Sequence, residues 1–257
     1  MERADVLDWR GALRRAAVPR AGQGDARTPG SLTPVTVYPD LEFPAAPPER
    51  PYVFINMVST IDGKTISGER HEPVTQLGSR RDHATMHDLE RHVQAILIGA
   101  ETVRATPVIN WPAGVLRLAA SRTGRLDPNA SFFQCSTGEA WVVLPQDAVA
   151  AATPGLPLWP VGQSEVDWET FLRELRIHKK VTHLLVEGGS EINAEFLRRD
   201  LVDELFLTLA PKIRLGRDLP TYAGGEPLPP GHLMNFDLVS CRPVENEVFL
   251  RYRRRTA

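Results

Sequence analysis

The sequence predicts an α/β protein of three layers: a mostly parallel central sheet, helices on both of its faces, and an antiparallel hairpin at its C-terminal edge. Two observations carry this prediction. From Pro51 onward, short apolar runs typical of buried strands alternate with amphipathic helical stripes, an order that produces a parallel sheet. The last two apolar runs have no helix between them, which favours an antiparallel pair.

Each predicted strand is a short apolar run bounded by turn residues or a polar segment. The first, PYVFINMV, follows a proline and ends shortly before the turn-like pair Asp62-Gly63, as a buried strand does. Seven later runs have the same character. The predicted strands are residues 51–58, 94–100, 115–120, 140–144, 183–187, 204–210, 236–241 and 247–252.

Three helices are predicted where apolar residues recur at helical spacing behind a capping residue. The predicted N-caps are Ser79, with Asp82 three residues later, then Asp167, and then Ser190. The apolar stripes that follow these caps are Met86, Leu89 and Val93; Trp168, Phe171, Leu172 and Leu175; and Ile192, Phe196 and Leu197. Helices in these places would cover a sheet built from the strands between them.

The first 50 residues differ in composition from the rest of the chain. Residues 18–50 are rich in proline and glycine, which disfavour helix and sheet alike. Before them, Val6, Leu7, Trp9 and Leu13 have the spacing of one short amphipathic helix. The sequence therefore predicts an N-terminal helix and Pro/Gly-rich arm over 1–50, and one folded domain over 51–257.

Composition excludes several function classes. A net charge of −2 provides no positive field for nucleic acid. Cys135 and Cys241 are the only cysteines, and they match neither a disulfide framework nor a cysteine zinc site. No apolar stretch approaches the roughly 18 residues of a membrane span, and the N-terminus does not resemble a secretion signal. We expect a cytoplasmic protein that binds neither nucleic acid nor membrane.

The sequence LLVEGGSEIN, residues 184–193, is the most informative segment. It reads as a strand that ends in Glu187, two glycines, and then a helix. Glycines let a ligand approach the backbone closely, and the free N–H groups of a helix N-terminus attract phosphate. The alternative is an ordinary strand-to-helix turn. A second strand, in ILIGAE (96–101), also ends in a glycine turn, and parallel strands bring such ends to one edge of the sheet.

Other motifs for nucleotide binding or catalysis are absent. The chain contains no G-x-G-x-x-G fingerprint, no P-loop and no G-x-S-x-G nucleophile elbow. His83, His87 and His92 recur on one predicted helix, but without the H-E-x-x-H arrangement of a zinc site. We expect no metal.

Five segments together resemble the reductase family of riboflavin biosynthesis, that is, the RibD C-terminal domain. The resemblance covers residues 51–253, and PTYAGGE (220–226) is similar to the stand-alone reductases that act on the diaminopyrimidine. The segments are STIDGK (59–64), ILIGAETVRA (96–105), SRTGRLDP (121–128), LLVEGGSEINAEFL (184–197) and LVDELFLTLAPKI (201–213). The resemblance implies a dihydrofolate-reductase-like fold, NADPH as cofactor, a ribosylaminopyrimidine phosphate as substrate, and a homodimer. Residues 201–213 are either part of the dimer interface or buried core.

The resemblance also implies roles for individual residues. Glu187 and Lys64 would orient the substrate, with Asp62 and Glu101 as candidate proton donors. Arg122 would meet the 2′-phosphate of NADPH, because a guanidinium suits a phosphate dianion. The residues implied to contact the cofactor are Thr102, Ser121, Arg122, Gly188, Gly189, Ser190, Glu191, Ile192 and Asn193.

The chain departs from the family pattern at two places. Ala105-Thr106-Pro107 stands where the family usually has a carboxylate pair or Asp-Asn before proline, and Glu90 stands where it often has arginine. Arg80 and Arg81 could replace that arginine toward a substrate phosphate. The function predicted is NADPH-dependent reduction of the ribosyl group to ribityl. The alternatives are a reductase of the same fold with a pterin-like or unknown substrate, and a non-catalytic NADPH-binding protein.

Overall fold

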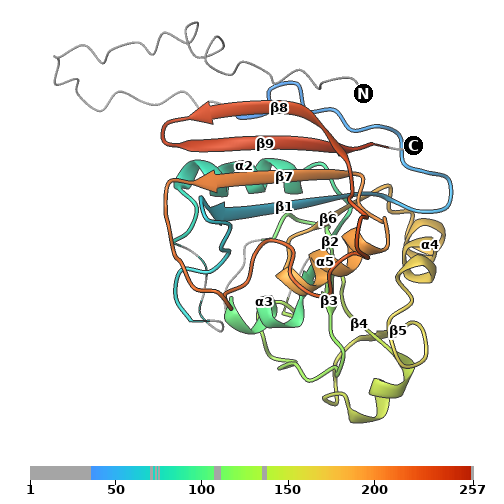
Figure 1. Ribbon diagram of the computed structural model, residues 1–257. Helices are drawn as coiled ribbons and strands as arrows, with labels where there is room; N and C mark the ends of the chain where they lie inside the picture. The colour runs from blue at the N-terminus through green and yellow to red at the C-terminus, as the bar shows by residue number, and fades with distance from the viewer. Residues whose placement is uncertain are drawn as a thin grey trace, which may run out of the picture. The chain divides into compact units, whose positions relative to one another are not determined.

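The computed structural model describes residues 36–69, 72, 74, 76–106, 111–134 and 138–255. Within these residues one mixed sheet runs through the molecule in the order β5-β4-β3-β2-β6-β1-β7-β9-β8 (Figure 1). The strands are β1 Tyr52–Thr60, β2 Ala95–Gly99, β3 Leu116–Ala120, β4 Ala140–Leu144, β5 Leu158–Pro160, β6 His183–Val186, β7 Glu204–Ala210, β8 Phe236–Val244 and β9 Glu247–Arg254. All eight predicted strands are present, and β5 is an addition.

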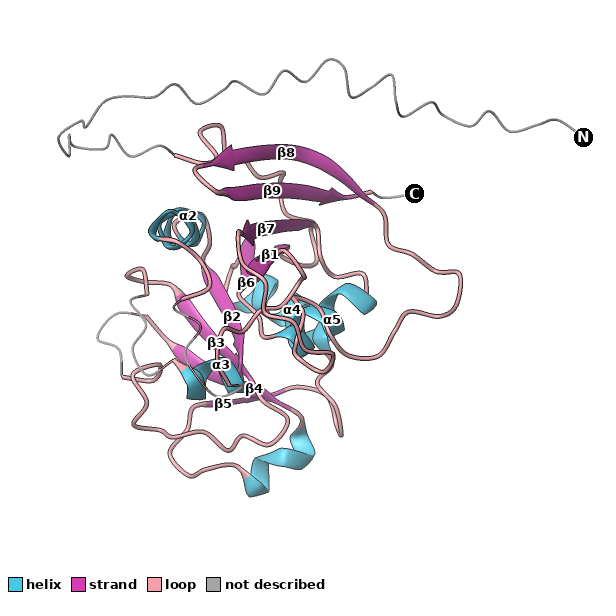
Figure 2. Cartoon of the chain, turned by 60° about the vertical axis from the view of Figure 1, so that its left-hand side comes forward, coloured by secondary structure: helices cyan, strands magenta, loops and turns pink. Residues whose placement is uncertain are grey.

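The helices form two outer layers. Figure 2 shows α2 (Arg80–Glu90) on one face of the sheet and α4 (Trp168–His178) and α5 (Ser190–Arg198) on the other. Strands β1 to β7 pair in parallel, whereas β9 pairs antiparallel with both β7 and β8. The three-layer prediction with its antiparallel edge hairpin is therefore confirmed. The sequence did not predict α3 (Ala100–Ala105) or the 3₁₀ helix at Gln146–Ala151.

Side chains along the central strands point alternately to the two faces of the sheet, and so form two hydrophobic cores. Val53, Ile55 and Val186 point to the α4 and α5 side, where they pack with Phe171 and Phe196. Residues at the alternate positions of β1, β2 and β6 point to the α2 side; these are Phe54, Ile96, Ile98 and Leu185. Because the strands are buried on both faces, the sequence shows continuous apolar runs in place of alternation.

The segment before β1 belongs to the α2-side core. Val37 is 2% exposed, and the ring of Phe43 stacks on Phe54 with centroids 4.4 Å apart. Arg50 forms a bidentate ion pair with Asp203. The compact unit accordingly spans Thr36–Ala257, so its boundary lies before the position expected at residue 50. The predicted N-terminal helix lies outside the described residues.

Two of the three predicted helix caps are confirmed. The Ser79 side chain accepts hydrogen bonds from Arg81 N and Asp82 N, and Asp167 accepts one from Thr170 N. The prediction for Ser190 is wrong. The N-cap of α5 is Gly189, and the Ser190 hydroxyl instead accepts a hydrogen bond of 2.7 Å from the Gly224 N–H. A long-range backbone donor thus takes the oxygen that a local cap would use.

Candidate functional site

The two glycine turns meet at the carboxyl ends of neighbouring strands, as predicted. Gly99 N donates to Gly188 O at 2.7 Å, and Glu187 N donates to Leu97 O at 3.0 Å. A Cβ on Gly99 would lie 3.2 Å from Gly189 N, so any larger residue would press the two turns apart by a few tenths of an ångström. Ligands of open α/β sheets bind outside the carboxyl ends of the strands, so this junction is the candidate cofactor site.

The N-terminus of α5 opens onto this junction. A Cβ added to Gly189 would have only Thr102 Oγ1 within 4 Å, at 3.9 Å, so the space beside this backbone is open. Free N–H groups of the first helical turn, from Ser190 onward, lie at the same end of the helix. An open backbone and an anion-attracting helix end fit a nucleotide phosphate.

The other cofactor residues expected on α5 divide into two groups. Asn193 is fully buried, and its Nδ2 donates to Tyr222 O at 2.7 Å, while Ser190 holds Gly224. These two side chains therefore fasten the loop 222–225 onto the helix. Ile192 packs in the core, and Glu191 is exposed. Cofactor contact by these four residues stays a prediction.

Ser121 and Arg122 follow β3, which pairs with β2. The Ser121 hydroxyl accepts hydrogen bonds from Thr123 N and Gly124 N, and so shapes the turn. The Arg122 side chain is exposed and has no hydrogen-bond or ion-pair partner among the described residues. Arg122 is thus available for an anionic ligand at the same edge of the sheet.

Lys64 and Asp62 lie in the turn after β1. The Lys64 ammonium group donates to Leu219 O at 3.4 Å. Asp62 Oδ1 and Oδ2 accept hydrogen bonds from Arg214 N and Leu215 N, at 3.1 and 2.8 Å. A hydrogen bond from Thr60 and these amides hold the pKa of Asp62 at about 2, so it is ionised at neutral pH. An ionised carboxylate cannot donate a proton, which argues against Asp62 as the acid.

Glu187 has the opposite environment. Its side chain follows Leu185 onto the α2 face, since side chains alternate along a strand, and its Oε1 is buried with no hydrogen-bond partner in the described part of the chain. Burial and the nearby charges of Glu90 and Asp82 raise the pKa of Glu187 well above its ordinary value. A carboxyl group held in this way is neutral more readily than a surface glutamate.

The sequence did not indicate that Asp82 lies near Glu187, and it showed Glu90 only as a departure from the family pattern. Both are buried on α2, at 7% and 1% exposure. Their eight-residue separation on the helix that carries Thr85 and Leu89 would have placed them on one face. Arg80, in contrast, is exposed at the start of α2. His87 Nδ1 forms a hydrogen bond with Glu90 Oε2. Among the described residues, no group of three or more side chains is placed to bind a metal ion.

Comparison with known proteins shows the family to which the chain belongs. Residues 51–250 match the profile of the RibD C-terminal domain. The chain belongs to this family. It is 30% identical over 69% of its length to the 2,5-diamino-6-ribosylamino-4(3H)-pyrimidinone 5′-phosphate reductase of Aquifex aeolicus, covering 84% of that protein. The enzyme of the same name from Methanothermobacter thermautotrophicus is also 30% identical over 69% of the chain and is 85% covered.

Solved structures agree on the fold. The bifunctional deaminase and 5-amino-6-(5-phosphoribosylamino)uracil reductase of Thermotoga maritima superposes with a TM-score of 0.63 at 23% identity, over 80% of this chain and 57% of that one. The dihydrofolate-reductase-like fold expected from the resemblance is confirmed. The chain is a reductase of the riboflavin-biosynthesis type, and this family uses a nicotinamide cofactor. No helix in the described ranges is long and apolar enough to span a membrane.

Proposed function

We propose that this protein reduces the ribosyl group of a ribosylaminopyrimidine 5′-phosphate to ribityl, with NADPH, in the cytoplasm. One observation carries the proposal: Glu187, with a buried carboxyl oxygen that has no hydrogen-bond partner among the described residues, directly precedes the Gly188-Gly189 turn. A group that can bind substrate thus stands next to the backbone that fits a cofactor. The names of the two relatives support the substrate class.

The chain's own residues would hold the cofactor in two places. The Gly189 backbone and the first turn of α5 fit the pyrophosphate, with Thr102 beside them. Arg122 would pair with the 2′-phosphate at the end of β3. When bound, the nicotinamide supplies a hydride to C1′ of the sugar.

The substrate would lie on the α2 side of this junction. Glu187 would accept hydrogen bonds from it, and Lys64, in the turn after β1, would help to orient it. Asp62 positions Lys64 indirectly, because its carboxylate fastens the segment 214–215 against the same turn. Opening of the ribose to the imine exposes C1′, and one proton and one hydride complete the reduction.

The function is tested by following NADPH oxidation with the diaminopyrimidine and uracil forms of the ribosylamino phosphate. Glu187→Gln keeps the shape of the side chain and should retain NADPH affinity while losing about tenfold or more in kcat/KM, since about 1.4 kcal/mol is one decade. Unchanged turnover in this variant would contradict the role of Glu187. A wild-type protein that binds NADPH without reducing either form would favour a non-catalytic NADPH-binding protein. Turnover of a pterin alone would favour a reductase of the same fold with a pterin-like substrate.

The choice of NADPH over NADH is tested separately. Titration of both cofactors into wild type and Arg122→Ala should show a preference for NADPH that the variant loses, because a charge-assisted bond is worth about 1.5–3 kcal/mol. Glu101 pairs with Arg104, so Arg104→Ala is a control from the same edge of the sheet. Equal affinities in wild type would reject the 2′-phosphate assignment.

A further inference from the structure

The segment 219–225 connects the two parts of the candidate site. It lies in the connection between β7 and β8, outside the helices and strands. One of its ends is hydrogen-bonded to the turn after β1, which carries Lys64, and the other to the first turn of α5. The first of these places would orient the substrate, and the second fits the cofactor phosphate. One short piece of backbone therefore contacts both.

At the substrate end, the segment holds Lys64 and Thr65. Thr65 N donates to Pro220 O at 3.0 Å, and the Lys64 ammonium group donates to Leu219 O at 3.4 Å. Thr65 is buried, and its hydroxyl donates to Pro220 O and Thr221 O at 3.3 and 3.4 Å. Lys64 and Thr221 also form an antiparallel bridge. The backbone and the ammonium group of Lys64 are thus both fixed by the segment.

At the cofactor end, the segment is hydrogen-bonded to α5. Gly224 N donates to Ser190 Oγ at 2.7 Å and to Ser190 O at 3.3 Å. Asn193, which is fully buried, donates from Nδ2 to Tyr222 O at 2.7 Å. Ser190 directly follows Gly189, whose backbone borders the open space of the cofactor site. A displacement of this helical turn would therefore displace Gly224 and Tyr222 as well.

The segment has features that make it stiff between these two ends. Pro220 has a fixed φ, and the Thr221 hydroxyl donates to Ala223 O at 3.0 Å. Gly224 lies close against α5, because an added Cβ would be 2.7 Å from Ser190 Oγ. Coupling between two sites is carried by such chains of packed and hydrogen-bonded groups. A stiff connection passes a displacement on instead of absorbing it.

We propose that the segment 219–225 couples cofactor binding to substrate binding, with Ser190, Asn193 and Thr65 as positioning residues. This inference rests on the proposed function and adds how the two halves of the site are aligned. With a cofactor on the first turn of α5, the segment holds Lys64 in the place where it orients the substrate. Hydride transfer needs such alignment, because small misplacements of the reacting atoms slow a reaction strongly. By linkage, each ligand must strengthen the binding of the other by the same factor.

Amide hydrogen exchange tests the coupling with NADP⁺ alone as the probe. In the wild-type protein, saturating NADP⁺ should slow exchange in residues 61–66 by about fivefold or more, because the Thr65 N–H is bonded to the segment. Gly224→Ala should lose this protection, since its Cβ separates the segment from Ser190. The φ of Gly224 is not in the left-handed region, so alanine can adopt its backbone.

Thr65→Val weakens the other end of the segment and should lose the protection too. It keeps the shape of the side chain and removes only the hydroxyl, which does not contact α5. Thr182→Val is the matched control, because the Thr182 hydroxyl bonds Gln94 at the opposite ends of the strands. This control should keep the protection of residues 61–66.

Calorimetry measures the coupling with both ligands. The wild-type protein should bind the diaminopyrimidine form of the ribosylamino phosphate about fivefold or more tightly when NADP⁺ is present. In Gly224→Ala and Thr65→Val this ratio of affinities should fall toward one. A merely structural defect would weaken binding in both conditions and leave the ratio unchanged.

Each outcome decides the proposal. Exchange that NADP⁺ leaves unchanged in the wild-type protein, a wild-type affinity ratio of one, or variants that behave as wild type would overturn the coupling. If such a protein still reduces its substrate, the proposed function stands without it. Protection that depends on the segment, in a protein that reduces neither form, would support the coupling and reject the proposed reaction. Should Gly224→Ala fail to fold, Thr65→Val decides.

Discussion

Two carboxylates near the ends of β1 and β6 show how surroundings decide the chemistry of a residue. Asp62 accepts hydrogen bonds from two backbone amides and stays ionised, whereas burial and like charge raise the pKa of Glu187. The resemblance implies a role at the site for both of them, Glu187 in orienting the substrate and Asp62 as a candidate proton donor. Only their contacts separate a carboxylate that shapes a turn from one that can meet substrate.

Asp82 gives a prediction for stability against pH. Burial raises its pKa from 3.8 to about 6, against a hydrogen bond from Thr208 that lowers it. The folded state therefore keeps this proton between pH ~4 and ~6 after the unfolded state has lost it, so the free energy of unfolding falls as pH rises through that window. Asp82→Asn removes this cost, and should gain up to about 3 kcal/mol relative to wild type between pH 4 and 8.

Urea unfolding of both proteins across this pH range measures the difference. Glu90 and Glu187 also have raised pKa values, so the variant keeps part of the slope. Parallel curves for wild type and Asp82→Asn would show that Asp82 carries no such cost.

At the scale of elements, the two glycines of the turn between β6 and α5 have different roles. Gly188 has φ +78°, and an added Cβ would lie 2.9 Å from Met57 Sδ; Gly189 has φ −69° and open space beside it. Gly188→Ala should therefore lower the melting temperature, because left-handed backbone costs about 1–2 kcal/mol. Gly189→Ala should fold normally and bind NADPH at least tenfold more weakly.

Thermal melts and fluorescence titration with NADPH separate these effects. Should Gly189→Ala bind the cofactor as tightly as wild type, the turn would be an ordinary strand-to-helix connection. A large loss of stability in Gly189→Ala would lead to the same conclusion.

The N-cap of α2 is held by a residue that lies far away in the sequence. Ser79 caps the helix as the sequence predicts, but its own N–H and hydroxyl bond to Glu247 at the start of β9, at 2.9 and 2.5 Å. The expected partner, Asp82, turns inward toward Thr208 instead. The helix that carries Glu90 is thereby tied to the C-terminal hairpin.

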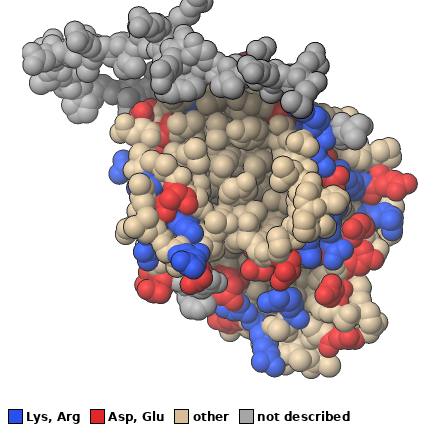
Figure 3. Space-filling model, viewed as in Figure 1, with Lys and Arg blue, Asp and Glu red and all other residues tan. Residues whose placement is uncertain are grey.

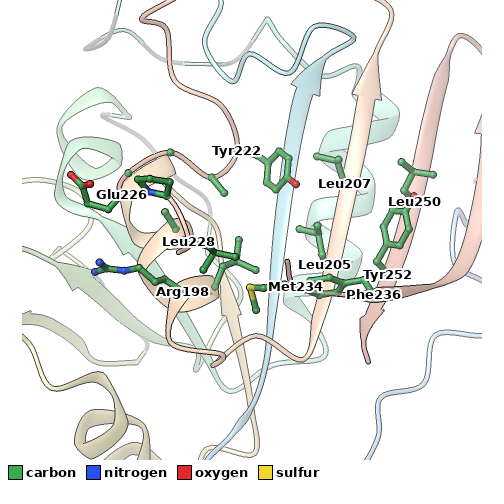
Figure 4. A pocket seen from close by; sticks show the side chains of 16 residues that line it. Arg198, Leu205, Leu207, Tyr222, Glu226, Leu228, Met234, Phe236, Leu250 and Tyr252 are labelled. Atoms are coloured by element: carbon green, nitrogen blue, oxygen red, sulfur yellow. The ribbon is translucent and has the colours of Figure 1, made fainter. Parts of the chain in front are cut away.

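At the scale of the whole molecule, one face is largely free of charge. Figure 3 shows charged side chains around the rim of this face and few in its centre. A groove of about 570 Å³ lies here between α5 and the sheet. Figure 4 shows the apolar side chains that line it on the side of the sheet, namely Leu205, Leu207, Leu250, Tyr252 and Phe236. Leu205 and Leu207 belong to the segment for which a homodimer interface is one of two expectations, so we propose that a second copy covers this face.

Leu238 tests this proposal. It is 54% exposed on β8 and pairs with Tyr252, so it borders the groove on the same face. Leu238→Lys should shift the protein from dimer to monomer in light scattering, because a lysine would be buried without a partner. Ile177→Lys, at a 47% exposed position on α4, is the control. A monomeric wild type, or a dimer unaffected by Leu238→Lys, would reject this interface.

The sequence by itself determined the strand order along the chain, two helix caps and the glycine junction, because these depend on residue period and turn chemistry over a few neighbours. It also placed Glu187 directly before the Gly188-Gly189 turn. Only the tertiary structure decided what faces Glu187. Asp82 and Glu90 lie about a hundred residues earlier in the chain, and packing of α2 onto the sheet brings their charges to it. Desolvation and like charge depend on distance in space, which local sequence patterns do not contain.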